Sequence, residues 1–187
     1  MKPNRTAAGL ARSAEEFLEA RKFDACLYVC ALAVAEDPQE PLPYFVRGRC
    51  LAAIGRFDDA LPFLQTAVAL QPDNADFHAA FAGALDDTGY LEEACEHYSL
   101  ALEHNRNLIE PLLGRAEVRQ RMGDFRGALE DLDAYLALRP RSAHALVHRG
   151  ISHLAAGRRA QAQEDFDRAV ALEPAQAERV QRLTGGL

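Results

Sequence analysis

The sequence predicts an all-α solenoid of five helix-turn-helix units, followed by a C-terminal capping helix. Three observations support this fold class. A segment that begins at Gly55 recurs in steps of 34 residues, starting again at Gly89, Gly123 and Gly157. Glycine and proline recur in fixed columns of this repeat, and small residues occupy further columns. A fixed period of this size in helical sequence is typical of a solenoid, in which each unit packs only on its neighbours.

The composition is that of a folded chain. Of the 187 residues, 49% are apolar and 26% are charged, which permits a buried core and argues against disorder. The formal net charge of −7 makes nucleic acid an unfavourable partner, because phosphate binding needs a basic stripe. The first residues lack the apolar run of a secretory signal, and no later window resembles a membrane span. We therefore expect a cytoplasmic protein without a membrane partner.

The repeat divides nearly the whole chain. Residues 1–6 are polar, and we expect them to be frayed. The five units are predicted at 7–40, 41–74, 75–108, 109–142 and 143–174, with a capping helix and tail at 175–187. The two helices of each unit are predicted at 7–20 and 24–36, 41–54 and 57–70, 75–88 and 91–104, 109–122 and 125–138, and 143–156 and 159–172. The capping helix is predicted at about 175–183, with Val180 and Leu183 packed on the fifth unit and Arg179 in water.

The glycine column marks the end of each first helix. Glycine adopts the left-handed C-terminal conformation at little cost, so each of these residues ends a helix and begins a turn. Arg21 replaces glycine in the first unit, and we expect a looser or differently shaped turn there. The proline column follows the second helices, where proline prevents their continuation.

Other columns predict contacts between the paired helices. Gly48, Ala82, Ala116 and Gly150 stand where these helices approach most closely. Arg115 precedes Asp131 by sixteen residues, and Arg149 precedes Asp165 by sixteen. This spacing brings the side chains of antiparallel helices together, so two structural ion pairs are expected. Arg47 has Phe63 in the matching position and should be freer to reach another carboxylate or a ligand.

These columns resemble the tetratricopeptide repeat. The second unit is the closest match, because Tyr44, Gly48, Leu51, Gly55, Ala60, Leu64, Ala67 and Pro72 all fit. The resemblance covers about nine tenths of the chain and implies a right-handed superhelix that binds other proteins. It also implies that the first helix of each unit lines a concave groove, suited to a helix or an extended peptide.

The resemblance also indicates which side chains face the groove. Small residues in the middle unit, Ala79, Ala80 and Gly83, should leave room for another chain. The expected partner contacts are Phe45, Arg49, Asp86, Asp87, Leu113, Glu117, Val147, His148 and Ile151. The alternative for each apolar residue is that it packs between units.

No motif indicates catalysis, so the chain is not expected to be an enzyme or to carry a cofactor. His144 and His148 are four residues apart on one helix face and could share a metal ion. Because no third ligand is evident, a polar groove lining is the favoured interpretation, and no metal site is expected. Cys26 and Cys30 also share a helix face, and we interpret them as buried free thiols.

The charge distribution suggests the chemistry of a partner. Residues 56–110 contain two positive and eleven negative side chains, a net charge of −9. This acidic middle favours a protein partner with a basic segment, or serves only for solubility. The leading hypothesis is an adaptor or scaffold that holds a peptide or helix in its groove. One alternative is a client-shielding chaperone, since small acidic proteins of this family resemble those of bacterial type III secretion. Another is a self-associating structural subunit of a larger assembly.

Overall fold

The computed structural model describes residues 6–185. Residues 1–5, most of the segment predicted to be frayed, lie outside the described residues. Thr6 caps the first helix, because its hydroxyl accepts a hydrogen bond of 3.1 Å from the Gly9 amide. Within the described residues every regular element is helical, so the predicted fold class is confirmed.

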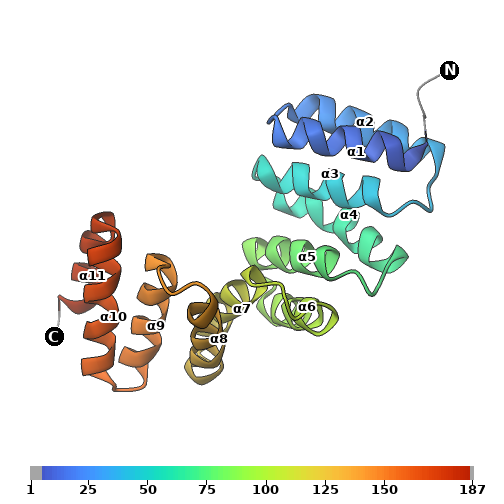
Figure 1. The fold of residues 1–187 in the computed structure, drawn as a ribbon. Helices are drawn as coiled ribbons and strands as arrows, with labels where there is room; N and C mark the ends of the chain where they lie inside the picture. Colours follow the sequence, from blue (N-terminus) through green and yellow to red (C-terminus); the bar gives the residue numbers. More distant parts are fainter. Residues whose placement is uncertain (1–5, 186–187) are drawn as a thin grey trace. The chain divides into compact units, whose positions relative to one another are not determined.

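The helices follow the predicted pairs, and every helix end lies within two residues of its predicted position. The pairs are α1 (Ala7–Glu19) with α2 (Phe23–Glu36), α3 (Leu42–Ala53) with α4 (Phe57–Leu70), α5 (Ala75–Thr88) with α6 (Leu91–His104), α7 (Glu110–Arg121) with α8 (Phe125–Leu138), and α9 (Ala143–Ala155) with α10 (Arg159–Leu172) (Figure 1). A short 3-10 turn, Pro174–Gln176, then leads into α11 (Ala177–Thr184).

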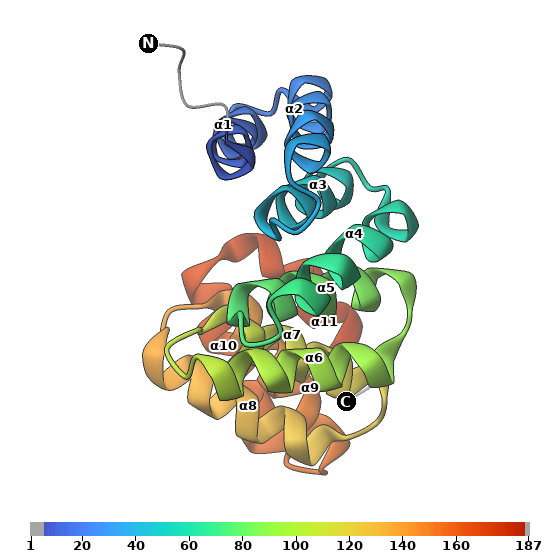
Figure 2. The ribbon, with the colours of Figure 1, turned by 90° about the vertical axis from the view of Figure 1, so that its right-hand side faces the viewer.

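The chain forms two compact units. Unit 1 comprises residues 1–105 and contains α1 to α6; unit 2 comprises residues 106–187 and contains α7 to α11. Within unit 1, the helices of each pair pack on each other, and α1 to α4 also pack on the pair that follows, as the stacked ribbons of Figure 2 show for α1 to α5. Within unit 2, α7 and α8 pack on α9, which packs on α10. Each unit therefore buries its own core.

The glycine column behaves as predicted. Gly55, Gly89, Gly123 and Gly157 have φ between +73° and +88°, the left-handed conformation that ends a helix. The prediction of a looser or differently shaped turn at Arg21 is wrong, because Arg21 adopts the same left-handed conformation with φ of +54°. Its turn also has the hydrogen bonds of the glycine turns: the Lys22 amide donates to the Phe17 carbonyl, as the Tyr90 amide does to Leu85. Hydrogen bonding thus imposes the turn on a residue that ordinarily avoids it.

Both predicted ion pairs are present in unit 2. Arg115 donates from Nε and Nη2 to the two carboxylate oxygens of Asp131, at 3.0 and 2.6 Å. Arg149 binds Asp165 in the same way, at 2.8 and 2.7 Å. Both carboxylates are buried, so these hydrogen bonds replace the water that the charges lose.

The capping helix is partly as predicted. Val180 is buried in the core cluster of unit 2, whereas Leu183 is exposed. The expectation that Arg179 faces water is wrong: its Nη2 lies 3.0 Å from His148 Nε2, and its side chain is only partly exposed. The capping helix therefore contributes a polar contact to α9 as well as apolar cover.

Candidate interaction surfaces

The first candidate surface is a hollow of about 400 Å³ in unit 1, which we call the α3–α5 hollow. It is lined by Leu18, Arg49, Ala52, Ala53, Phe57, Leu64, Ala80, Gly83, Ala84 and Asp87. Most of these residues belong to the first helices of their pairs, α1, α3 and α5. Its volume falls in the range of about 300–1,000 Å³ that is usual for ligand sites.

Small side chains create this hollow. A Cβ atom added at Gly83 would make only an ordinary contact with the Tyr98 hydroxyl, at 3.7 Å, so the helix is loosely packed there. Ala52, Ala53 and Ala80 continue the shallow surface on α3 and α5. The predicted small-sided middle unit thus coincides with an observed depression, edged by the exposed side chains of Arg49 and Asp87.

Phe45 does not serve this surface as predicted. Its ring packs against Phe77 with 4.6 Å between centroids, and only 8% of the residue is exposed. The guanidinium of Arg49 also lies over the Phe45 ring, 5.2 Å from its centroid. Phe45 therefore supports Arg49 from the core, and it is not an exposed anchor. Asp86, the remaining predicted contact of unit 1, is partly buried on α5.

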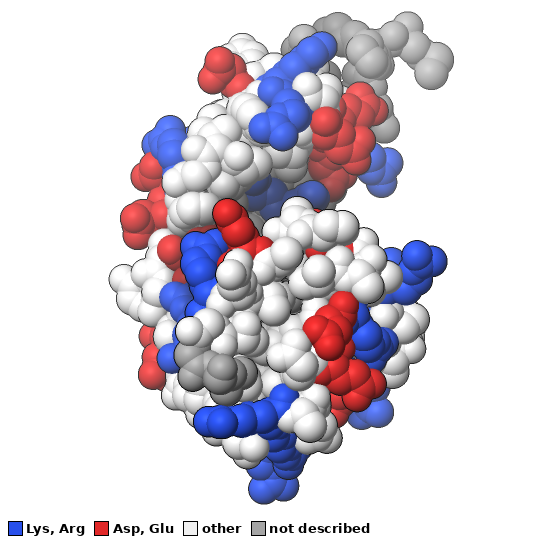
Figure 3. All heavy atoms as spheres, turned by 90° about the vertical axis from the view of Figure 1, so that its left-hand side faces the viewer, with Lys and Arg blue, Asp and Glu red and all other residues white. Residues whose placement is uncertain are grey.

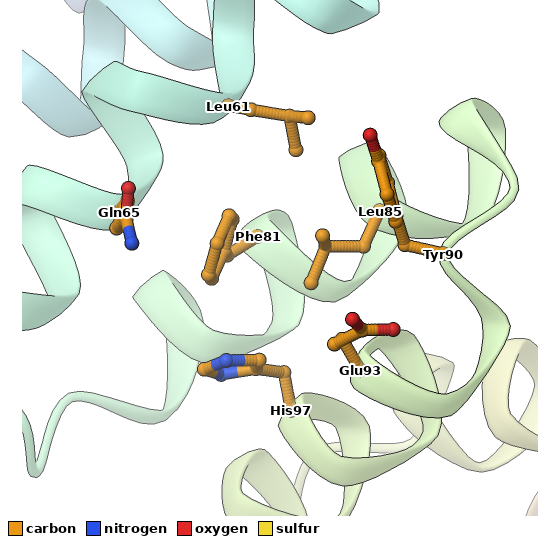
Figure 4. Close-up of a pocket in the computed structure, with 7 residues that line it drawn as sticks. All are labelled: Leu61, Gln65, Phe81, Leu85, Tyr90, Glu93 and His97. Atoms are coloured by element: carbon orange, nitrogen blue, oxygen red, sulfur yellow. The ribbon is translucent and has the colours of Figure 1, made fainter.

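A second hollow in unit 1, of about 350 Å³, was missed by the sequence reasoning (Figure 4). It is lined by Leu61 and Gln65 of α4, Phe81 and Leu85 of α5, Tyr90 just before α6, and Glu93 and His97 of α6. Phe81 and Leu85 fit the core pattern of the repeat, so nothing in the sequence distinguished them. The one hint in the sequence is Tyr90, an aromatic residue next to the glycine turn. In the structure Tyr90 is 51% exposed.

The predicted apolar contacts of unit 2 belong mostly to its core. Val147 is completely buried in the hydrophobic cluster, which corrects its prediction as a groove contact. Leu113 and Ile151 are partly buried and pack against the same cluster. The physical reason is that β-branched and leucine side chains of α7 and α9 fill the space between adjacent pairs.

Glu117 and His148, the predicted polar contacts of unit 2, lie together with His144. His144 Nε2 is 2.7 Å from Glu117 Oε1, and His148 Nε2 is 3.9 Å from the same oxygen. The two imidazole rings have centroids 4.5 Å apart. One ligand atom from each of the three residues lies within 4.8 Å of the other two. The third potential ligand that the sequence did not reveal is therefore Glu117 of α7.

Gln120 fixes the orientation of His148. The Gln120 Nε2 amide donates to the His148 carbonyl and to Ser152 Oγ, each at 2.6 Å. Its Oε1 then faces His148 Nδ1 at 2.6 Å, so Nδ1 carries the proton and donates it. His148 Nε2 consequently has a free lone pair, which accepts from Arg179.

Burial shapes the protonation of this cluster. Loss of water lowers the pKa of His148 to about 4, although the nearby Glu117 carboxylate acts in the opposite direction. Burial raises the pKa of Glu117, but the hydrogen bond from His144 and the neighbouring His148 lower it overall. At neutral pH the cluster therefore combines a neutral imidazole with a carboxylate.

The cysteines are free thiols, as predicted. Cys26, Cys30 and Cys50 are completely buried, and Cys95 is partly buried. Burial raises the pKa of Cys26 and Cys30 to about 11 and that of Cys50 to about 12. These thiols are poor nucleophiles and poor metal ligands, because both roles require the thiolate.

The surface carries both signs of charge. On the face drawn in Figure 3, acidic and basic side chains alternate among uncharged ones. Among the described residues, no helix combines the length and the apolar character that a membrane crossing requires.

The paired helices, the left-handed glycine turns and the small-residue columns define a helical repeat protein. Tetratricopeptide repeat family models match residues 7–80, 51–115 and 113–177. The chain therefore belongs to the tetratricopeptide repeat family.

Two curated relatives illustrate the match. The chain is 28% identical over 116 residues to tetratricopeptide repeat protein 16 of Homo sapiens, covering 58% of this chain but 13% of that protein. It is 34% identical over 90 residues to tetratricopeptide repeat protein 36 of Danio rerio, covering 46% of this chain and 48% of that protein. The chain thus spans less than half the length of either relative.

Solved structures share the fold at low identity. A crystal structure of MamA protein superposes with a TM-score of 0.80 at 19% identity, covering 92% of this chain and 94% of that one. The crystal structure of YrrB, described as a tetratricopeptide repeat protein with an unusual peptide-binding site, has a TM-score of 0.84 at 17% identity. That match covers 98% of this chain and 94% of YrrB. At such identities the likeness concerns the fold.

Proposed function

We propose that this chain is a protein-interaction scaffold whose α3–α5 hollow holds a peptide or helix of a partner. The observation that carries this proposal is the hollow itself, which combines an open, alanine-rich floor with charged edges. Family membership supports a role in binding proteins, and the peptide-binding site described for YrrB supports a peptide as the ligand.

The hollow favours a partner that inserts a large apolar side chain. Ala52, Ala80 and Gly83 leave the backbone of α3 and α5 accessible to such a group. Burying an apolar anchor in a preformed depression contributes most of the affinity in interfaces of this kind. We propose that the residues flanking the anchor are basic, because residues 56–110 have a net charge of −9. Asp87 at the edge of the hollow is placed to meet a basic side chain, and Arg49 to meet an acidic one.

The mechanism is reversible association. The anchor displaces water from the apolar floor, and the acidic surroundings speed the encounter and set its direction. No covalent step is involved. A client-shielding chaperone would use the same surface, whereas a structural subunit would leave it empty or fill it with a second copy.

The test is a peptide selection followed by two tryptophan variants. Peptides are selected from a random displayed library on the intact chain, and their binding is measured by fluorescence anisotropy. Ala53 is exposed and lines the hollow, so Ala53→Trp fills it without disturbing the core. We expect this substitution to weaken binding at least about tenfold.

Ala155 supplies the matched control, because it occupies the same repeat column in unit 2 and is also exposed. Ala155→Trp should leave peptide affinity unchanged. Equal binding by Ala53→Trp and the wild type would contradict the proposed surface. If selection yields no peptide, and sedimentation shows the chain associating with itself, the structural-subunit alternative is the better account.

A further inference from the structure

We propose that Glu117, His144 and His148 form a binding site for a divalent first-row transition ion such as Zn²⁺. The site joins α7 and α9 of unit 2 and is independent of the α3–α5 hollow. Two imidazole nitrogens and one carboxylate oxygen are ligands that zinc uses widely, with a fourth position open to water or to a partner's side chain.

The geometry needs only small adjustments to accept the ion. Metal–ligand bonds of about 2.0–2.1 Å in a tetrahedron place neighbouring ligand atoms about 3.4 Å apart. The ligand atoms here lie within 4.8 Å of one another, and two of the distances are 2.7 and 3.9 Å. His144 and Glu117 are partly exposed, at 47% and 30% of their side chains, so rotation of their outer bonds meets little resistance.

The second layer of contacts prepares His148 as a ligand. Its Nδ1 proton is held by Gln120 Oε1 at 2.6 Å, and Gln120 is itself fixed by the His148 carbonyl and Ser152. This arrangement leaves the lone pair on Nε2, which lies 3.9 Å from Glu117 Oε1. Hydrogen bonds of this kind, which fix the tautomer of a ligating histidine, are usual around metal ions in proteins.

His144 must change its tautomer. Its Nε2 now donates a proton to Glu117 Oε1, and the ion would take the place of that proton. The Nε2 proton is lost to solvent and Nδ1 takes one up from solvent, so the ring remains neutral while Nε2 binds the ion. Glu117 exchanges a hydrogen-bond donor for the ion, and its carboxylate charge offsets part of the charge of the ion.

Arg179 competes with the ion for His148. Its guanidinium Nη2 occupies the Nε2 lone pair at 3.0 Å, and its positive charge opposes a cation at the same point. Metal binding therefore requires this side chain to swing away. We infer that metal binding releases a polar contact between the capping helix α11 and α9, while it ties α9 to α7.

The experiment uses the full chain without a histidine tag, treated with chelator and titrated with Zn²⁺ by calorimetry. The cobalt(II) spectrum in the visible range reports the coordination directly. We expect one ion per chain. His144→Ala, a substitution at a half-exposed position, and Glu117→Gln should each weaken binding by at least about 100-fold. Gln120→Leu should weaken it by about 10–100-fold.

Arg179→Ala distinguishes the metal site from a hydrogen-bonded cluster. It removes the competing cation, so zinc affinity should rise about tenfold, whereas loss of a merely structural contact would not increase it. His104→Ala, an exposed histidine of unit 1, is the matched control and should leave binding unchanged. Unaltered zinc affinity in His144→Ala and Glu117→Gln, or the absence of any stoichiometric binding by the wild type, would overturn the proposal.

Discussion

The two units use one repeat template with different chemistry between paired helices. In unit 2, Arg115 and Arg149 each bind a buried aspartate sixteen residues later. In unit 1, the arginine of the same column, Arg47, faces Phe63, and its guanidinium lies 4.3 Å from the ring centroid. Its Nε is buried without a hydrogen-bond partner among the described residues. The sequence predicted that Arg47 would be free to reach another carboxylate or a ligand. Instead, its guanidinium is held against the aromatic ring of Phe63.

The first helices of the pairs also carry different side chains in the two units. In unit 1, α3 and α5 present alanine, glycine and a shallow hollow. In unit 2, α7 and α9 present Glu117, Gln120, His144 and His148. The repeat thus determines where the helices pack, whereas the residues that do not pack between helices differ in chemistry between the two units. We propose peptide binding for the first surface and metal binding for the second.

The largest expected effect comes from the ion pairs of unit 2. Asp165 is buried and accepts two hydrogen bonds from Arg149. These bonds are the main reason that the pKa of Arg149 is raised above its ordinary value. Asp165→Ala should lower the free energy of unfolding by about 3 kcal/mol, because the largely buried guanidinium of Arg149 loses its buried partner and keeps only the exposed carboxylate of Asp133. Urea unfolding measures this loss. Phe63→Ala in unit 1 removes no charged partner, so it should lower the free energy of unfolding by less than Asp165→Ala. A larger loss for Phe63→Ala would contradict the proposed difference between the units.

The close-packed glycines test what the units share. A Cβ at Gly150 would lie 2.5 Å from the buried ring of Phe166, and one at Gly48 would lie 2.5 Å from Leu64. We expect Gly150→Ala and Gly48→Ala each to destabilise the fold by about 2–3 kcal/mol, because the ring of Phe166 and the Cγ atom of Leu64 are both buried and cannot move aside freely. Gly83→Ala is the control: its Cβ would make only an ordinary contact with the Tyr98 hydroxyl, so the change should be neutral or stabilise slightly. Thermal unfolding of the three variants decides the order.

His148 of unit 2, whose side chain is largely buried, should make stability depend on pH. The folded-state pKa of His148 is about 4, below the ordinary 6.5, so the unfolded chain binds more protons as the pH falls through this range. Stability is then lost on acidification. Between about pH 7.5 and 5, the wild type should lose about 2 kcal/mol more than His148→Gln, measured by urea unfolding with chelator present. Burial also lowers the pKa of His97 and His153, so the stability of both the variant and the wild type retains a smaller dependence on pH from these residues. Parallel curves for the two proteins would contradict the assignment.

The smallest expected effect lies at the first turn of unit 1. Arg21 holds φ of +54° where the other units have glycine, and a left-handed conformation costs a residue with a side chain about 1–2 kcal/mol. Glycine is more flexible in the unfolded chain, which offsets part of this gain. Arg21→Gly should therefore stabilise the protein by about 0.5–1 kcal/mol. Gly89→Ala, the reverse change in the third pair, should destabilise it by a similar amount in the same denaturant assay.

Much of the fold follows from the sequence, because the repeat supplies several signals for one structure. Period, glycine, proline and small-residue columns agree on each helix, and the spacing of sixteen residues identified both ion pairs. The turn at Arg21 was not predictable from residue preference, since the backbone hydrogen bonds outweigh it. The burial of Phe45 and Val147 was also missed, because helix periodicity does not separate a groove position from one packed between pairs.

The polar cluster of unit 2 needed the structure. Glu117 and His144 are 27 residues apart, and Gln120 and His148 are 28 apart. This offset relates facing positions on consecutive first helices, so it is a spacing that sequence reasoning could have searched. The contribution of Arg179 depends on the angle at which the capping helix docks, and no column of the repeat encodes that angle.

The most direct test of divided function is an NMR titration of the labelled chain with a selected peptide and then with zinc. The account predicts that the peptide shifts amide resonances around Arg49, Ala53 and Gly83, and that zinc shifts those around Glu117, His144 and His148. The two sets should be additive in either order of addition. Peptide-induced shifts centred on Leu61 and Tyr90, or on the residues that respond to zinc, would contradict the assignment of peptide binding to the α3–α5 hollow.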